Sequence, residues 1–299
     1  MKLARPDIFH PRIVLAGCPQ QVAGDGDDAG LVAALGQRGL HARWLSWDDP
    51  EVGGADLVIL RATHDYAGRL DEFLAWTTGV ANVLNAPGVV AWNADRRYLG
   101  DLAHRGVPTV PGEVFGPGDR VRLPRTGHVF VGPTIGSTTR LCAIGADDAD
   151  SADGSAAAAY VAELHRAGHS VFVQPGGPAA ETALVFLGGE PSHAFTGAAD
   201  ALVADEPDFE VWDVGSAALA AAAAQVGIHP TELLYARAHV VGDPPRLREL
   251  QLVDPSLGWR RLDASTRDLA QREFALRVES ALERLGLGPL SRRDSHRGP

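Results

Sequence analysis

The chain has 299 residues, of which 45% are hydrophobic, and a formal net charge of -11 at pH 7. This length is enough for two or three packed lobes around a sizeable hydrophobic core. The acidic balance argues against nucleic acid and against an anionic membrane as partners, because both would repel the chain at long range. Small molecules, a second copy of the chain and a partner enzyme remain open as partners.

A few sequence features limit the cellular location and the cofactor chemistry. The first residues hold too short an apolar run for a signal peptide, and no segment approaches the ~20 apolar residues of a spanning helix. We therefore expect a cytoplasmic protein. The two cysteines, Cys18 and Cys142, lack CxxC spacing and favour neither a disulfide framework nor a zinc site. Lys2 is the single lysine, so a catalytic lysine in the body of the fold is excluded.

Apolar runs and helical patterns alternate over the first part of the chain. An apolar run that ends at Gly17 is followed by a helical pattern that ends at Gly39. The alternation continues and predicts a parallel sheet in a small α/β domain over residues 1–88. The expected strands are 12–17, 42–46 and 55–60, and the expected helices are 27–40 and 70–80.

The pattern over residues 89–290 predicts two α+β lobes, a small one over about 125–175 and a C-terminal one over about 176–290. A segment rich in Gly, Asp, Ser and Ala after Arg140 predicts a mobile loop, and 291–299 a disordered tail. Turn residues separate the expected elements. We expect helices over 93–104, 156–167, a run after 216 and 269–285, and strands over 114–115, 128–131, 170–174, 183–187, 192–196, 233–241 and 246–253.

Five segments spread over nearly the whole chain resemble the motifs of the ATP-grasp superfamily, in its glutathione-synthetase-like branch of peptide and antibiotic pathways. Each motif alone is weak, but five in the same order are specific. They are WDDP at 47–50, DLVILRATHDY at 56–66, WNADRRYL with GVP at 92–108, ETALVF with SHA at 181–194, and LYARAH with ELQLVDP at 234–255. The resemblance implies an α/β fold in which a small N-terminal parallel lobe precedes two α+β lobes that clasp a nucleotide cleft.

The resemblance also implies a chemistry. ATP phosphorylates the carboxylate of an amino-acid-like substrate, and an amine then displaces phosphate from the acyl phosphate and forms a C–N bond. The implied cofactors are ATP and Mg²⁺, and the implied partners are small-molecule carboxylates and amines. Phosphoryl transfer depends on positioning and charge neutralisation, so the site needs cations near the phosphates and carboxylates on the metal.

Four residues after a predicted strand form the implied substrate site. Arg61, Thr63, His64 and Asp65 lie where open α/β sheets present ligand groups. The resemblance implies that the Arg61 guanidinium binds a substrate carboxylate through two parallel hydrogen bonds. An internal Arg61–Asp65 ion pair is an equal alternative, and packing within the turn is an alternative role for Thr63. His64 stands where the family has Trp, which points to an altered substrate.

Five residues are the implied nucleotide contacts. Arg96 replaces a family lysine that touches the phosphates, and Arg140 is a second candidate cation. Val173 and Gln174 match the hinge whose backbone reads adenine, and Glu181 matches a further family position. Each assignment has a structural alternative: a solvated helix cation for Arg96, an ordinary strand end for the hinge, and a paired strand-end carboxylate for Glu181.

The resemblance places a catalytic cation and a metal site on the last strand pair. Arg237 matches the residue that steadies charge on the transferring group. The implied Mg²⁺ ligands are His239, Glu249, Gln251 and Asp254. His239 stands where the family has Asp, and Mg²⁺ prefers hard oxygen ligands. A softer transition metal is therefore an alternative occupant.

Two functions stay open. The first is a divergent, active carboxylate–amine ligase, which the persistence of the motif around Arg61 favours. The second is a catalytically inactive homologue that binds a metabolite or scaffolds a partner enzyme. Gly132, in place of a family lysine, and His239 favour the second function. Losing a phosphate cation and a metal carboxylate costs several kcal/mol of transition-state stabilisation, because one preorganised donor alone is worth ~3 kcal/mol.

Overall fold

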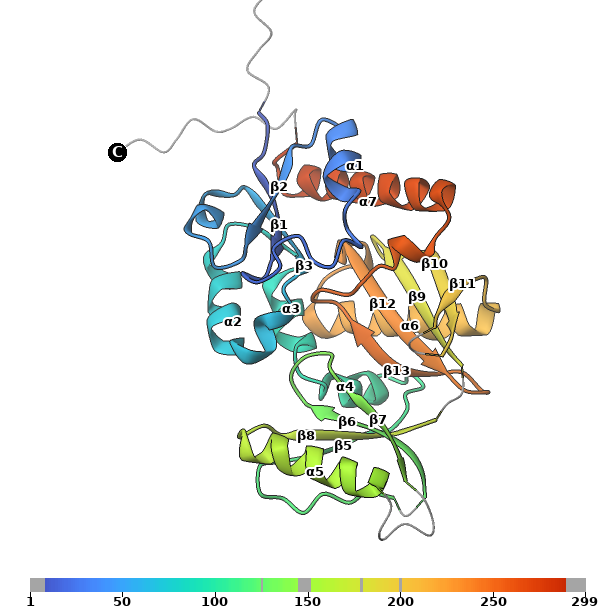
Figure 1. Ribbon diagram of the computed structural model, residues 1–299. Helices are drawn as coiled ribbons and strands as arrows, with labels where there is room; N and C mark the ends of the chain where they lie inside the picture. The colour runs from blue at the N-terminus through green and yellow to red at the C-terminus, as the bar shows by residue number, and fades with distance from the viewer. Residues whose placement is uncertain (1–8, 125, 145–151, 178–179, 199–200, 289–299) are drawn as a thin grey trace, which may run out of the picture.

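The computed structural model describes residues 9–124, 126–144, 152–177, 180–198 and 201–288. Over these residues the strands form three sheets, one in each of three lobes (Figure 1). The N-terminal and C-terminal lobes share a core, and the small lobe extends from one end of the molecule. None of the described helices is long and apolar enough to cross a membrane. The expected tail at 291–299 and part of the expected mobile loop lie outside the described residues.

The N-terminal lobe is a parallel sheet whose central strands are apolar on both faces, as such sheets require. Its elements are β1 Ile13–Gly17, α1 Leu31–Gln37, β2 Ala42–Ser46, β3 Leu57–Ala62, α2 Leu70–Gly79 and β4 Val83–Leu84. The strand order is β2-β1-β3-β4. Alternate residues of β1 and β3 pack toward α1 on one face and α2 on the other. The three expected strands and their parallel arrangement are confirmed.

Helix α1 begins four residues later than expected, because two carboxylates before it bond elsewhere. Asp28 forms a bidentate pair with Arg61, with both contacts at 3.1 Å, and accepts a hydrogen bond from Trp259 Nε1 at 2.9 Å. Asp27 accepts two backbone N–H groups from segment 258–260, each at 2.9 Å. These bonds fix the loop after the last strand against the N-terminal lobe.

The small lobe is an antiparallel sheet with one helix on one face. Its elements are β5 Glu113–Phe115, β6 Gly127–Pro133, β7 Arg140–Ile144, α5 Ala152–Arg166 and β8 Val171–Gly176, and the strand order is β5-β8-β6-β7. Val129, Val131 and Val173 pack toward Tyr160 of α5, while Phe130 faces the C-terminal lobe. Strand β7 was not predicted, because it is a partly exposed edge strand that follows a loop rich in Gly, Ser and Thr.

The C-terminal lobe is an antiparallel sheet of order β11-β10-β9-β12-β13. Its elements are β9 Glu181–Leu187, β10 Glu190–Gly197, β11 Val203–Asp205, α6 Phe209–Val226, β12 Tyr235–Val241, β13 Arg246–Gln251 and the closing helix α7 Ala264–Arg284. Both expected strand pairs are confirmed. Helix α6 covers one face, and α7 packs against α1 of the N-terminal lobe (Figure 1). Short 3₁₀ turns occupy Pro50–Gly54, His64–Gly68, Pro230–Glu232 and Trp259–Arg261.

The helix expected over 93–104 is two helices, α3 Pro87–Asn93 and α4 Tyr98–His104. In the break between them, the Arg96 N–H donates to Thr134 O at 2.8 Å instead of continuing the helix. Thr134 belongs to the turn that joins β6 to β7, so the small lobe meets the rest of the molecule here. The continuous helical pattern was therefore wrong at this point, and the break places Arg96 between the lobes.

Side chains at the two ends of this break bind the outer edge of β13. Asn93 Nδ2 donates to Leu250 O at 2.9 Å, and its Oδ1 accepts the Leu252 N–H at 2.7 Å. Tyr98 Oη accepts the Leu250 N–H at 2.9 Å. An edge strand leaves backbone groups unpaired unless something covers them. The two side chains do so, and they fix β13 relative to α3 and α4.

We expect Asn93→Ala to lower the free energy of unfolding by about 2–4 kcal/mol, because two buried backbone groups lose their partners. Urea denaturation followed by circular dichroism measures this difference. The matched control is Gln225→Ala, which removes an exposed side chain that accepts from Arg105, and we expect it to cost less than about 0.5 kcal/mol. Equal effects of the two substitutions would contradict the role of Asn93.

Candidate nucleotide and substrate site

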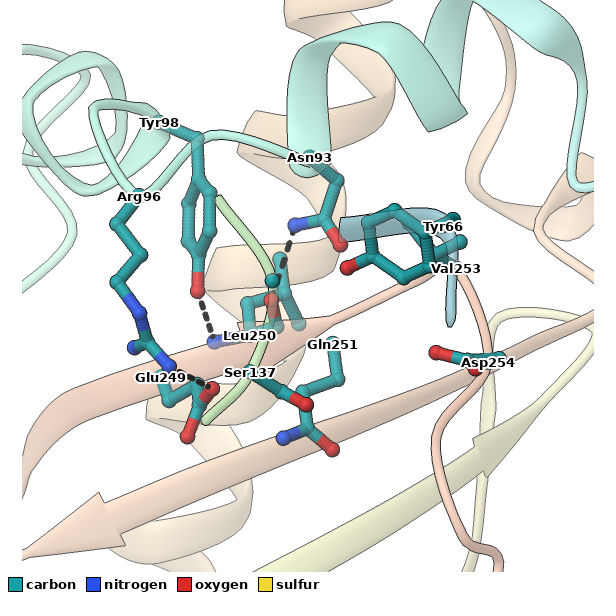
Figure 2. Close-up of a pocket in the computed structure, with 11 residues that line it drawn as sticks. Tyr66, Asn93, Arg96, Tyr98, Ser137, Glu249, Leu250, Gln251, Val253 and Asp254 are labelled. Atoms are coloured by element: carbon teal, nitrogen blue, oxygen red, sulfur yellow. Dashed lines mark hydrogen bonds and ion pairs between the residues drawn. The ribbon is translucent and has the colours of Figure 1, made fainter. Parts of the chain in front are cut away.

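A small polar cavity of about 30 Å³ lies where the three lobes meet. This volume holds about one or two water molecules. Its lining comes from the 3₁₀ turn after β3, the α3–α4 break, the β6–β7 turn, and β13 with the segment after it (Figure 2). The lining residues are Tyr66, Asn93, Arg96, Tyr98, Gly136, Ser137, Glu249, Leu250, Gln251, Val253 and Asp254.

A buried ion network stands at one end of this cavity. Glu249 lies between Arg96, at 3.0 Å, and Arg248, at 3.5 Å. Arg248 also pairs with Glu181 at 2.8 Å, and Glu181 contacts His239 Nδ1 at 3.1 Å. The five side chains are between 3% and 7% exposed. The structure therefore brings Arg96, Glu181, His239 and Glu249 together, and the solvated alternative for Arg96 is wrong.

Arg248 was not among the predicted site residues, because a regular strand would send it to the face opposite Glu249. The β12–β13 register shifts at this point: His239 pairs with Glu249, but the next residue, Val240, pairs with Leu247. Arg248 is the extra residue of a β-bulge, which turns its side chain toward Glu249. Bulges often re-aim side chains near functional sites. No sequence signal marks this one.

The network keeps both carboxylates ionised and the imidazole neutral. Burial alone would raise the pKa of Glu249, but Arg96 and Arg248 outweigh it and lower that pKa to about 2. The pKa of Glu181 is lowered in the same way, against burial, by His239 and Arg248. Burial, together with Arg237, lowers the pKa of His239. The neutral ring therefore donates from Nδ1 to Glu181 and leaves Nε2 as an acceptor.

Four buried nitrogen atoms of this region have no hydrogen-bond partner among the described residues. They are the Nε atoms of Arg96, Arg237 and Arg248, and Nε2 of His239. A guanidinium stays protonated in proteins, so its Nε is always a donor. Three donors therefore stand fixed in the buried site without acceptors, an arrangement that suits an anionic ligand.

The other end of the cavity is lined by oxygen-bearing side chains. In Figure 2, Asp254, Tyr66 and Gln251 lie across the pocket from Arg96. Burial raises the pKa of Asp254 to about 7, although Arg61 acts to lower it. The cavity is thus polarised: the Arg96 guanidinium, paired with Glu249, lies at one end, and the oxygen atoms of Tyr66, Gln251 and Asp254 lie at the other.

The four predicted substrate residues do not act as one group. The bidentate fork of Arg61 is taken by Asp28, and its side chain is fully buried, so the alternative Arg61–Asp65 pair is wrong. Asp65 instead accepts a hydrogen bond from Trp47 Nε1 at 2.9 Å.

The remaining two residues of this group differ in exposure. Thr63 is buried, whereas His64 is exposed and has its Nε2 3.4 Å from Cys18 Sγ. None of the four lines the cavity. A substrate contact for Arg61, Thr63, His64 or Asp65 stays a prediction.

Two positions of the small lobe bear on phosphate binding: the predicted contact Arg140, and Gly132, where the family has a lysine. The Arg140 guanidinium stacks on Tyr160 at 3.8 Å from the ring centre, on the face that α5 covers, so it lies away from the cavity. At Gly132 an added Cβ would lie 2.4 Å from Thr138 O. No side chain fits there, because the β6–β7 turn folds across that position.

The predicted hinge residues lie in β8, which pairs with β6. Gln174 donates from Nε2 to Val110 O at 3.0 Å and to Arg248 O at 3.1 Å. Phe130 of β6 stacks on the Arg248 guanidinium at 4.7 Å. These contacts join the small lobe to β13. The hinge role of Val173 and Gln174 stays a prediction.

The arrangement does not fit the predicted Mg²⁺ site. Across the described residues, no three His, Cys, Asp or Glu side chains converge as a metal site requires. Both oxygens of Glu249 face guanidinium groups, and His239 offers a nitrogen where Mg²⁺ prefers oxygen. Gln251 and Asp254 lie nearby but supply one carboxylate between them. A metal role for these four residues has no support in their geometry.

Comparisons with known proteins agree with the fold. A family model described as "D-cycloserine synthetase DcsG, N-terminal domain" matches residues 13–85. The crystal structure of D-cycloserine synthetase DcsG has a TM-score of 0.73 at 28% identity and covers 89% of this chain and 99% of its own. D-alanine–D-alanine ligase from Bacillus anthracis, solved with ATP, has a TM-score of 0.66 at 13% identity, covering 93% and 98%.

The chain has the ATP-grasp fold, so the predicted fold class is confirmed, and its similarity to DcsG confirms the predicted kinship with antibiotic-pathway ligases. In sequence it is similar to the cycloserine biosynthesis protein DcsG of Streptomyces lavendulae. The two are 29% identical over 267 residues, which cover 78% of this chain and 88% of the relative.

A buried histidine near the site makes stability depend on pH. Burial lowers the pKa of His193 below its usual 6.5, although its Nε2 contacts Leu257 O at 2.7 Å. The folded protein keeps this ring neutral, whereas the unfolded chain takes up a proton near pH 6.5. The unfolded state then binds more protons, so this contribution to stability falls as the pH drops through that value.

We expect His193→Gln to lose less stability than the wild type between about pH 7.5 and about pH 5.5, by up to about 1.4 kcal/mol per pH unit. The glutamine keeps a donor for Leu257 O but does not titrate. His239 and Asp254 titrate in both proteins, so their contributions cancel in the comparison. Urea denaturation at a series of pH values measures the two slopes, and parallel curves would contradict the assignment.

Proposed function

We propose that the chain is an ATP-dependent ligase that joins a carboxylate and an amine through an acyl phosphate, on an amino-acid-like substrate. Its ATP-grasp fold and its similarity to DcsG over most of its length support the reaction class. The observation that carries the proposal is the polarised cavity, where Arg96, Glu249 and Gln251 of the motifs meet Ser137 and Asp254.

The unpartnered guanidinium donors suit phosphate oxygens. Charge-assisted hydrogen bonds to phosphate are among the stronger contacts in proteins, and fixed donors stabilise the charge that develops during phosphoryl transfer. In this proposal Arg96 binds a phosphate, and Arg237 steadies the transferring group. Arg237 donates at present to Ser256 O at 3.1 Å, which leaves its Nε free. ATP supplies the phosphoryl group.

The acceptor end of the cavity suits an amine. Gln251 and Asp254 present oxygen atoms there. Asp254 begins the segment 254–260, which Asp27 and Asp28 fix through hydrogen bonds. Arg61 donates to Pro255 O at 2.9 Å while it pairs with Asp28. We therefore assign Arg61 the positioning of Asp254, in place of direct substrate binding.

The cavity is too small for a nucleotide, so the lobes must separate before one binds. The contacts to break are the stacking of Phe130 on Arg248 and the two hydrogen bonds from Gln174. Lobe opening and closure of this kind sequester many active sites from water. We expect the protein to act in the cytoplasm on small-molecule carboxylates and amines, alone, as a homodimer or beside a partner enzyme.

A second candidate is a non-catalytic homologue that binds a metabolite or scaffolds a partner enzyme. The observation that favours it is that Glu249 pairs with Arg96 and Glu181 pairs with Arg248, so both carboxylates are directed at arginines of the chain itself. The two functions differ in one measurable respect. The ligase releases ADP when carboxylate and amine substrates are supplied, and the homologue releases none.

We expect ATP to raise the melting temperature and a panel of amino acids to stimulate ADP release. Arg96→Gln should weaken nucleotide binding by about 10–100-fold, because a charged hydrogen bond of about 1.5–3 kcal/mol is lost. Thermal shift and calorimetry measure binding, and a coupled assay measures ADP.

The matched control is Arg97→Gln, whose exposed side chain pairs with Asp95 outside the cavity. It should bind nucleotide like the wild type. Nucleotide binding without ADP release on any substrate would favour the non-catalytic homologue. If no nucleotide changes the melting temperature of the wild type, the ligase proposal is wrong.

A further inference from the structure

The carboxylates of the buried network are already occupied. Glu249 directs Oε1 to Arg96 and Oε2 to Arg248, and Glu181 directs Oε1 to His239 and Oε2 to Arg248. Each oxygen of the two carboxylates therefore already faces a guanidinium group or the His239 ring. A divalent ion here would also face two fixed guanidinium groups at close range in a medium of low dielectric constant, where repulsion is strong.

The same network is well suited to an anion. The cluster holds three guanidinium groups, those of Arg96, Arg237 and Arg248, and two carboxylates, those of Glu181 and Glu249. The surplus positive charge has unpartnered Nε donors. Each arginine is held before a ligand arrives, by Glu249, by Ser256 O or by Glu181. Side-chain donors that are already held in place need less ordering when an anion binds.

We propose that this site binds the phosphates of a nucleotide without a divalent metal ion, and that the guanidinium groups of Arg96 and Arg248 replace the metal in neutralising phosphate charge. The inference rests on the proposed function, since it concerns how the same site holds its nucleotide. Arginine suits this role because its planar fork binds phosphate oxygens in pairs and stays charged when buried.

The test is calorimetric titration of the full-length chain with ADP and with a non-hydrolysable ATP analogue, in excess EDTA and again in excess Mg²⁺. We expect dissociation constants that agree within about threefold between the two conditions. Binding that needs Mg²⁺, or that Mg²⁺ strengthens by about tenfold or more, overturns the inference and leaves the ligase proposal standing. Absence of binding in both conditions overturns both proposals.

A substitution locates the effect within the network. His239→Asp adds a carboxylate beside Glu249 and one negative charge near the phosphates, so binding in EDTA should weaken by about tenfold or more, with Mg²⁺ restoring part of it. His169→Asp makes the same change at an exposed position and should leave both titrations unchanged. If His239→Asp also leaves both titrations unchanged, the arginine cluster is not where the phosphates bind, and the inference is wrong.

Discussion

The position of the Glu249 carboxylate between two guanidinium groups connects all three lobes of the molecule. Arg96 comes from the α3–α4 break that touches the small lobe, and Arg248 reaches Glu181 on β9 while Phe130 of the small lobe stacks on it. Buried charges are tolerated only when they are paired, and removing one partner typically costs about 3–5 kcal/mol. The network therefore sets where the lobes can sit relative to one another, and the cavity follows from that placement.

The fold was largely predictable because its strands carry strong local signals. The apolar runs of β1 and β3 and the hairpin at Gly188 and Gly189 are readable from composition and turn residues alone. The errors occur where side chains form hydrogen bonds or ion pairs with residues far away in the sequence. Asp28 leaves the start of α1 to pair with Arg61, and the 93–104 helix breaks because Asn93 turns to the edge of β13. Such long-range bonds leave no periodic trace in the sequence.

The site was predictable where motif residues share one face of the sheet, and unpredictable where the backbone is irregular. His239 and Glu249 are direct neighbours across β12 and β13, as their motifs imply. Arg248 joins them only through a bulge, which no residue pattern announces. Arg140 shows the reverse case: its place near Gly132 in the sequence suggested a phosphate contact, but an unpredicted strand carries it to the α5 face.

Two of the departures from the family motifs, at Gly132 and His239, have a common physical consequence. A lysine cannot stand at 132, because the β6–β7 turn crosses that position and brings Ser137 into the cavity lining. An uncharged imidazole at 239 adds no negative charge to the cluster, so guanidinium groups outnumber carboxylates there. The site thus lacks a lysine cation at position 132 and lacks a carboxylate at position 239, so the two changes in charge oppose each other. In the proposed anion site, complementarity depends on this balance rather than on any single motif residue, so the effects of substitutions at 132 and 239 need not add.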